Sequence, residues 1–156
     1  MAKVYLETTI ISYLAARPSG DLIVAGHQHL TDEWWHARRP KFEVFVSQYV
    51  IDEAAQGDPE AAQRRLHLLR GLALLSSNDR VVELARRLVD EGAIPPSASQ
   101  DAVHIAMATV HGMDYLLTWN CRHIANAEII RAVTAICHDM GYDPPLICTP
   151  EELMGV

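Results

Sequence analysis

The stretch at residues 4–9, which reads VYLETT, decides the fold that this sequence predicts. A β-branched and aromatic run ends on a carboxylate and two hydroxyls, and an apolar pattern at helical spacing begins at Ile10. The stretch is therefore interpreted as a strand that leads directly into a helix. In a parallel α/β sheet such a junction lies at the carboxyl edge, where open-sheet proteins bind ligands. Glu7 stands at this junction, although a helix that begins with Thr8 or Thr9 as N-cap explains the same residues.

Length and composition indicate an ordinary globular protein. We expect one domain over residues 1–156, long enough to bury about two thirds of its unfolded surface. Hydrophobic residues make up 49% of the chain and charged residues 21%, which excludes an intrinsically disordered protein. Charges interrupt the apolar runs before the roughly 20 residues of a membrane span, and the amino terminus lacks the pattern of a secretory signal. We therefore expect a cytoplasmic protein.

Cysteine usage and net charge exclude further classes. Cys121, Cys137 and Cys148 are odd in number and far apart, so we expect small buried hydrophobic residues rather than disulfides or a metal knuckle. The net charge of −7 argues against a general polyanion binder. The arginine clusters at residues 38–39, 64–65 and 86–87 are interpreted as solvated helix faces, with a local phosphate-binding patch as the alternative.

Strands alternate with helices along the chain, which predicts a largely parallel sheet with right-handed crossovers. The helix expected at residues 100–111 is apolar almost all round, so it should be the buried central helix. Strands are expected near residues 4–6, 42–47, 72–75, 115–119 and 146–148. Helices are expected near residues 9–16, 22–39 with Pro40 as their end, 48–56, 60–70, 79–91, 100–111 and 127–140.

Four polar residues are expected at the carboxyl edge of this sheet. Glu7 and Asn120 follow two strands, Asp101 is in the first turn of the central helix, and Glu53 lies about one turn into the helix after the second strand. Three carboxylates and an amide describe an oxygen site suited to Mg²⁺ or Mn²⁺, which could activate water for phosphodiester hydrolysis. Each residue taken singly also has a structural explanation. Asp101 could stabilise the helix dipole, Glu53 could be a solvated surface residue, and Asn120 could form a turn.

Four segments of the chain resemble the signature segments of PIN domains, which are metal-dependent ribonucleases and include many bacterial VapC toxins. They are YLETT at 5–9, Ser47 with Asp52 and Glu53, DAVHIA at 101–106 and LTWN at 117–120. The resemblance implies a three-layer α/β/α fold with a five-stranded parallel sheet ordered 3-2-1-4-5. It also implies that Glu7, Glu53, Asp101 and Asn120 form the catalytic metal site, with the Thr8 hydroxyl in support.

The resemblance further implies an RNA substrate, a cognate antitoxin and a homodimer. The chain departs from the PIN pattern at two positions. Glu7 stands where Asp is usual and is one methylene longer, so a bound ion would sit farther out. Asn120 stands where an acid is usual, which lowers the charge of the site and weakens its affinity for metal, especially for a second ion.

The leading hypothesis is therefore a Mg²⁺- or Mn²⁺-dependent ribonuclease, a VapC-like toxin. One alternative is a catalytically weakened PIN-fold protein that binds RNA or a partner. Another is a transition-metal hydrolase site built from Asp101, His104 and the other histidines (His27, His29, His111 and His123), although a satisfied core histidine is the better explanation of His104. In a regular helix Trp34 and Trp35 cannot both face one core. We expect one of them to lie half-buried at the helix edge, with a subunit or partner surface as the alternative.

Overall fold

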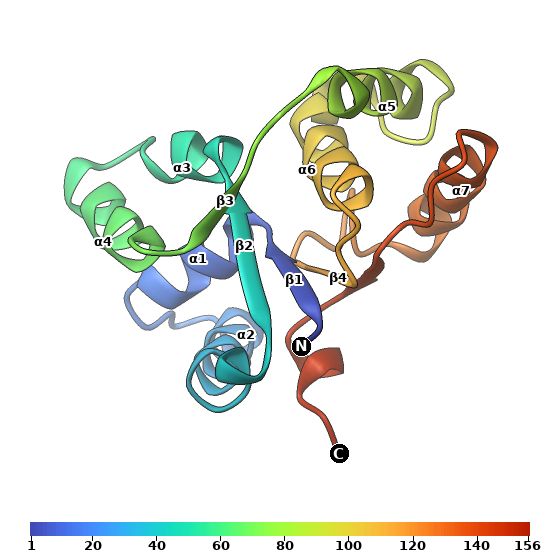
Figure 1. Cartoon of the computed structure of the whole chain (residues 1–156). Coiled ribbons are helices and arrows are strands. Elements are labelled where there is room, and N and C mark those ends of the chain that lie inside the picture. Colours follow the sequence, from blue (N-terminus) through green and yellow to red (C-terminus); the bar gives the residue numbers. More distant parts are fainter.

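The computed structural model describes all 156 residues and shows an α/β fold in three layers (Figure 1). Five parallel strands form one sheet in the order β3-β2-β1-β4-β5, which confirms the predicted topology. The strands are β1 (Lys3–Leu6), β2 (Glu43–Ser47), β3 (Ala73–Leu75), β4 (Tyr115–Leu117) and β5 (Leu146–Cys148).

Helices cover both faces of the sheet. Figure 1 shows α1 to α4 on one side of the strands and α5 to α7 on the other. The division follows from right-handed crossovers, because the chain moves outward from β1 to β3 and then returns to β4 and β5 on the other side. A topological switch point therefore lies at β1 and β4. The helices are α1 (Thr8–Ala15), α2 (Leu22–Glu33), α3 (Gln48–Ala54), α4 (Pro59–Leu69), α5 (Asp79–Asp90), α6 (Ser99–Val110) and α7 (Ala127–Asp139).

The central helix α6 is buried, as its sequence predicted. Within Ala102–Thr109 only Val103 is partly exposed, and the small side chains of Ala102 and Ala106 allow close packing. Thirty-four buried apolar residues form one continuous core around the sheet. This core holds the strand ends and the start of α6 in fixed positions, and the candidate site is built on these.

One prediction about the second helix is wrong. Helix α2 ends at Glu33, and one π-helical turn (Trp34–Arg38) and a 3-10 turn that contains Pro40 follow it. A π turn holds more residues than an α turn, so adjacent side chains are separated by a smaller angle and both can face the core. Trp34 is fully buried, and Trp35 is 8% exposed beneath the Arg39 guanidinium, whose carbon lies 4.1 Å from the ring centroid. Neither indole offers a partner surface.

Other differences are small. β4 ends at Leu117 rather than at Trp119, because the Trp119 N–H binds the Thr9 hydroxyl instead of a neighbouring strand. Cys137 and Cys148 are buried as expected, whereas Cys121 is exposed. None of the helices combines the length and the apolar character needed to cross a membrane.

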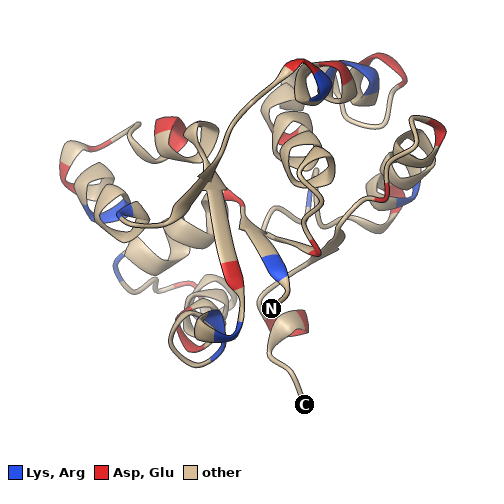
Figure 2. Ribbon diagram, viewed as in Figure 1, with Lys and Arg blue, Asp and Glu red and all other residues tan.

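The arginine clusters are tied into the protein. Figure 2 shows the basic residues mainly on helices. Arg64 and Arg65 donate hydrogen bonds to backbone carbonyl oxygens. Arg86 pairs with two carboxylates of its own helix, α5. Arg87 pairs with the carboxylate directly after α5 and with one in α7. These contacts support the interpretation as structural helix faces rather than as a free phosphate-binding patch.

Helix α5 provides a test of the packing. Leu84 is fully buried, while Val82 on the same helix is 59% exposed. We expect Leu84→Ala to lower the free energy of unfolding by about 2–5 kcal/mol, because it leaves a cavity. Val82→Ala should change it by less than about 0.5 kcal/mol. Urea denaturation of both variants measures the difference, and equal effects would contradict this orientation of α5.

Candidate functional site

Glu7 is the first residue after β1 and the N-cap of α1. Its side chain is 3% exposed, and Oε1 accepts hydrogen bonds from the Thr9 N–H (3.1 Å), the Thr9 hydroxyl (2.5 Å) and the Thr118 hydroxyl (2.7 Å). The cap is thus Glu7 itself, not Thr8 or Thr9. Oε2 makes no hydrogen bond within the chain. It is not fully enclosed, because Nε1 of Trp34 is the one fully buried polar side-chain atom that lacks a hydrogen-bond partner. One oxygen of Glu7 therefore organises the fold and the other faces the site.

Glu53 is held between two helices and the sheet edge. The Thr8 hydroxyl donates to Oε1 across 2.7 Å, and Nε2 of His104 in α6 donates to the same oxygen. The side chain remains 30% exposed. Partial burial raises the pKa of Glu53, but the hydrogen bond and charge of His104 and the Thr8 hydroxyl outweigh it, so the pKa lies below its ordinary value. The Thr8 hydroxyl is therefore one of the two groups that hold the Glu53 carboxylate.

His104 extends this contact into the core. Its ring is fully buried, and Nδ1 lies 2.7 Å from the Tyr5 hydroxyl, which lies 2.8 Å from the Ser47 hydroxyl. Both ring nitrogens have partners, so neither is free to bind a metal. Burial of Tyr5 raises the pKa of its hydroxyl well above the ordinary value, which keeps this link neutral. The core-histidine interpretation of His104 therefore explains its contacts.

Asp101 and Asn120 meet at His123. Asp101 Oδ2 lies 3.1 Å from His123 Nδ1, and Asn120 Oδ1 accepts the His123 backbone N–H across 3.0 Å. The Asn120 N–H in turn donates to the Thr118 hydroxyl. The loop after β4 is therefore organised by the same hydroxyl that holds Glu7. The loop brings Asn120 to the edge of the sheet, but the side-chain oxygen of Asn120 already accepts a hydrogen bond from the His123 N–H.

Three carboxylates act together on the buried histidine. Burial by itself lowers the pKa of His104, but the hydrogen bond to Glu53 and the charges of Glu7, Glu53 and Asp101 raise it above its ordinary value. The three acids thus lie close enough together to influence one group. Asp114, which precedes β4, binds the Lys3 N–H at the opposite edge and has no part in the site.

The donor chemistry fits a hard divalent cation, but the donors are not gathered around one point. Glu7, Glu53 and Asp101 each keep one oxygen without a hydrogen bond in the chain. No three acidic, histidine or cysteine side chains lie close enough to hold one ion. An ion at this edge would therefore require these side chains to turn toward each other. The histidine-based alternative gains nothing, because His104 is engaged and His111 binds the Ser76 carbonyl oxygen.

Several residues of this arrangement were not identified from the sequence as parts of the site. Tyr5 lies in β1, Thr9 in the first turn of α1 and Thr118 directly after β4, and they supply contacts to the acids or to His104. The signal in the sequence was a hydroxyl within or beside an apolar element. That signal is weak, because serine and threonine are common at strand and helix ends.

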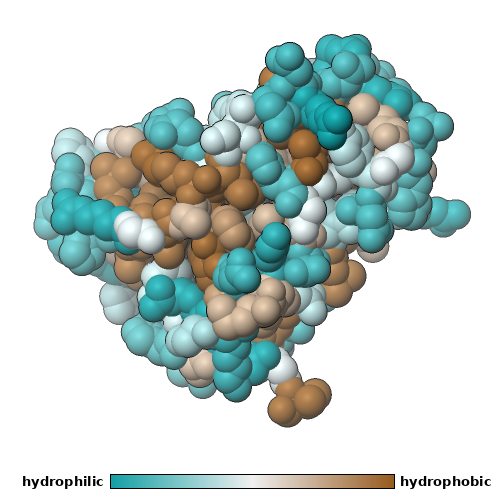
Figure 3. Space-filling model, in the orientation of Figure 1, coloured by the Kyte–Doolittle hydropathy of each residue, from teal (hydrophilic) through white to brown (hydrophobic).

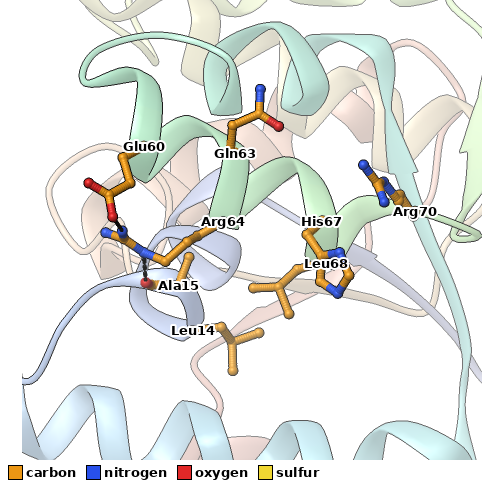
Figure 4. Close-up of a pocket in the computed structure, with 8 residues that line it drawn as sticks. All are labelled: Leu14, Ala15, Glu60, Gln63, Arg64, His67, Leu68 and Arg70. Atoms are coloured by element: carbon orange, nitrogen blue, oxygen red, sulfur yellow. Dashed lines mark hydrogen bonds and ion pairs between the residues drawn. The ribbon is translucent and has the colours of Figure 1, made fainter.

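The molecule's hollows lie elsewhere. One of about 550 Å³ opens between α1 and α4, with Leu14 and Leu68 as apolar walls (Figure 4). Arg64 donates to the Ala15 carbonyl oxygen there and lies 4.0 Å from Glu60. None of the candidate acids lines it, so the chemistry of the edge is not that of an enclosed pocket.

No protein-family model matches this sequence, and no curated protein sequence matches it. Similar solved structures include VapBC2 from Rickettsia felis bound to a DNA fragment from its promoter. That chain aligns at 15% identity with a TM-score of 0.56, over 94% of this chain and 98% of the other. They also include VapC20 from Mycobacterium tuberculosis, a toxin that cleaves the sarcin–ricin loop, at 17% identity and a TM-score of 0.53, over 72% and 86%. The comparison establishes the fold.

The His104–Glu53 contact predicts a distinctive pH dependence. The contribution of Glu53 is present above its ordinary pKa of 4.5 and is lost as pH falls through the lowered value. The contribution of His104 is present below its ordinary pKa of 6.5 and is lost as pH rises through the raised value. We therefore expect His104→Asn to lower the free energy of unfolding by about 1–3 kcal/mol. This loss should be largest between the two ordinary pKa values, at pH 4.5 to 6.5, where both contributions are present.

Urea denaturation across this pH range measures that loss. His138→Asn, an exposed histidine of α7, is the matched control and should behave like the wild type. A loss that does not vary with pH would show that His104 contributes only by packing.

Proposed function

We propose that this chain is a metal-dependent ribonuclease of the PIN type, a VapC-like toxin. The observation that carries the proposal is the hydrogen bonding that holds three acids at the carboxyl edge. Thr9 and Thr118 hold Glu7, Thr8 and His104 hold Glu53, and His123 contacts Asp101. Support comes from the shared fold of VapC20, which cleaves the sarcin–ricin loop.

A Mg²⁺ or Mn²⁺ ion is part of this proposal. The free oxygens of Glu7, Glu53 and Asp101 would hold it. When bound, such an ion lowers the pKa of a coordinated water and neutralises charge on the phosphate. The chain's own contribution is to orient the acids. Thr9 and Thr118 hold one oxygen of Glu7, while Thr8 and His104 hold one oxygen of Glu53.

A second candidate is a catalytically weakened PIN-fold protein that binds RNA or a partner. Two observations favour it. The carbonyl oxygen of Asn120 is already used by the loop, and no three donors are gathered at one point. Metal binding separates the candidates, since only the nuclease needs a stoichiometric ion.

A protein partner and a cytoplasmic location are also proposed. The fold is shared with a chain of VapBC2, which was solved on promoter DNA. We infer that this chain likewise assembles with an antitoxin. Its own net charge of −7 makes direct DNA binding unfavourable, so a partner would supply the contacts to nucleic acid.

Cleavage of RNA tests the nuclease. With Mn²⁺ and an RNA that carries a sarcin–ricin-type stem-loop, we expect Glu7→Gln and Asp101→Asn to lower the cleavage rate by about 100-fold or more, because each removes a proposed metal ligand. Asp52→Asn, which changes an exposed carboxylate beside Glu53, should retain activity. Gel assays with and without chelator measure the rates. Full activity in either acidic variant would refute the proposal.

Calorimetric titration with Mn²⁺ tests the site directly. We expect one ion per chain, weaker binding in Glu53→Gln and unchanged binding in Asp52→Asn. Asn120→Asp should tighten binding by about 5- to 10-fold, because an added charge near an ion contributes about 1 kcal/mol in water. Absence of stoichiometric binding would favour the weakened, non-catalytic candidate.

A further inference from the structure

The polar contacts behind Glu53 form one continuous network. Oε1 of Glu53 contacts Nε2 of His104, and Nδ1 of His104 lies 2.7 Å from the Tyr5 hydroxyl. The Tyr5 hydroxyl lies 2.8 Å from the Ser47 hydroxyl. A hydroxyl both donates and accepts hydrogen bonds, so Tyr5 can serve His104 and Ser47 at once. The network therefore starts at Ser47, directly before α3, and returns to α3 at Glu53.

Water reaches this network only at Glu53. Ser47, Tyr5 and His104 have no exposed surface, whereas the Glu53 side chain is 30% exposed. Figure 3 shows mainly hydrophobic residues on the surface over the region that β2, β3 and α4 occupy in Figure 1. Buried polar groups cannot exchange their partners for water, so the hydrogen bonds within the protein determine how these side chains are oriented.

Ser47 supplies a second, independent observation. It occupies the N-cap position of α3, where serine is among the most favoured residues because its hydroxyl can accept a helix N–H. The Ser47 hydroxyl makes no such contact and lies against the Tyr5 hydroxyl instead. Every other α-helix with a polar N-cap residue is capped by that side chain: α1 by Glu7, α2 by Asp21, α4 by Asp58, α5 by Asn78 and α7 by Asn126. Such a departure from a local rule is expected where a side chain serves a functional site.

The contacts at both ends of the His104 ring indicate what Ser47 and Tyr5 do. A half turn of a histidine ring about its last side-chain bond exchanges each nitrogen with a carbon atom. The Tyr5 contact at Nδ1 opposes this turn, because the turned ring would present carbon both to Tyr5 and to Glu53. With the ring held, Oε1 of Glu53 keeps its contacts to His104 and to the Thr8 hydroxyl, and Oε2 makes no hydrogen bond within the chain.

We propose that Tyr5 and Ser47 are positioning residues of the candidate site, which act through His104 to orient the Glu53 carboxylate and keep its Oε2 available. This inference rests on the proposed function, in which Glu53 is a metal ligand. Neither Tyr5 nor Ser47 touches an ion or RNA. Their hydroxyls fix the orientation of the His104 ring, and the ring determines which oxygen of Glu53 is free.

Nuclear magnetic resonance of the histidine rings tests the network in the ion-free protein. The Nε2 proton of His104 should exchange slowly with water in the wild type, and His104→Asn identifies its signal. Tyr5→Phe should accelerate this exchange by about 5-fold or more, because the ring loses one hydrogen bond. Tyr49→Phe removes another tyrosine hydroxyl, which lies 3.0 Å from the Ser77 hydroxyl, and should leave the exchange unchanged. Unchanged exchange in Tyr5→Phe overturns the proposal.

Calorimetric titration with Mn²⁺ tests the consequence for the site. Tyr5→Phe should weaken binding by about 10-fold, the lower end of the effect of removing a partner of a metal ligand. In the RNA cleavage assay kcat should fall while KM for RNA stays within about two-fold, because the contacts to RNA are unchanged. Tyr49→Phe should match the wild type in both assays. A Tyr5→Phe variant that loses stability but keeps its Mn²⁺ affinity has lost a structural contact only, and this result overturns the proposal.

A double variant tests whether Tyr5 acts through His104. In a His104→Asn background the link to Glu53 is already broken, so Tyr5→Phe should change the Mn²⁺ affinity by less than about two-fold. Additive effects of the two substitutions would show that Tyr5 influences the site by another route, which overturns the proposal.

Ser47→Ala covers the case in which Tyr5→Phe disturbs folding. It removes no helix cap, and the Mn²⁺ affinity should fall by about 3- to 10-fold, as expected for one neutral hydrogen bond. Ser77→Ala is the matched control and should bind like the wild type. Wild-type affinity in Ser47→Ala overturns the role of Ser47. If the wild type itself binds no Mn²⁺, the proposed function fails, and the exchange of the His104 proton in Tyr5→Phe and Ser47→Ala still decides whether the network holds the ring.

Discussion

The contact between His104 and Glu53 is the interaction on which the acidic edge depends. It joins α6 to α3, and the hydroxyls of Tyr5 and Ser47 extend it to β1 and β2. The imidazole contacts Glu53 directly, and the negative charges of Glu7, Glu53 and Asp101 raise its pKa. Because each link is buried or partly buried, the cost of leaving any partner unpaired keeps the set together. The geometry of the edge is therefore maintained by the core.

Glu7 shows how one residue serves structure and chemistry at once. As N-cap of α1 it satisfies an amide at the start of the helix, and as a hydrogen-bond acceptor it orders the loop after β4 through Thr118. Both contacts use Oε1, so Oε2 makes no hydrogen bond within the chain. Asn120 also has a structural role, because its amide oxygen accepts a hydrogen bond from the His123 N–H. As a neutral side chain it adds no negative charge to the edge. Glu7 and Asn120 thus both help to order the loop after β4.

The sheet separates these tasks in space. The carboxyl ends of β1, β2 and β4 position the polar residues, while β3 at the far edge is apolar and unprotected.

The sequence by itself determined the order and type of the elements, the strand order through its PIN resemblance, and the placement of Glu7, Glu53, Asp101 and Asn120 on one edge. It could do so because hydrophobic period and strand-end polarity are local properties. Only the tertiary structure decided which oxygen of each acid is free, that His104 contacts Glu53, and that Trp34 and Trp35 are both buried. Hydrogen-bond partners come from residues more than 40 positions apart, and a π turn changes side-chain direction without changing composition. Such contacts are set by packing, which no local pattern encodes.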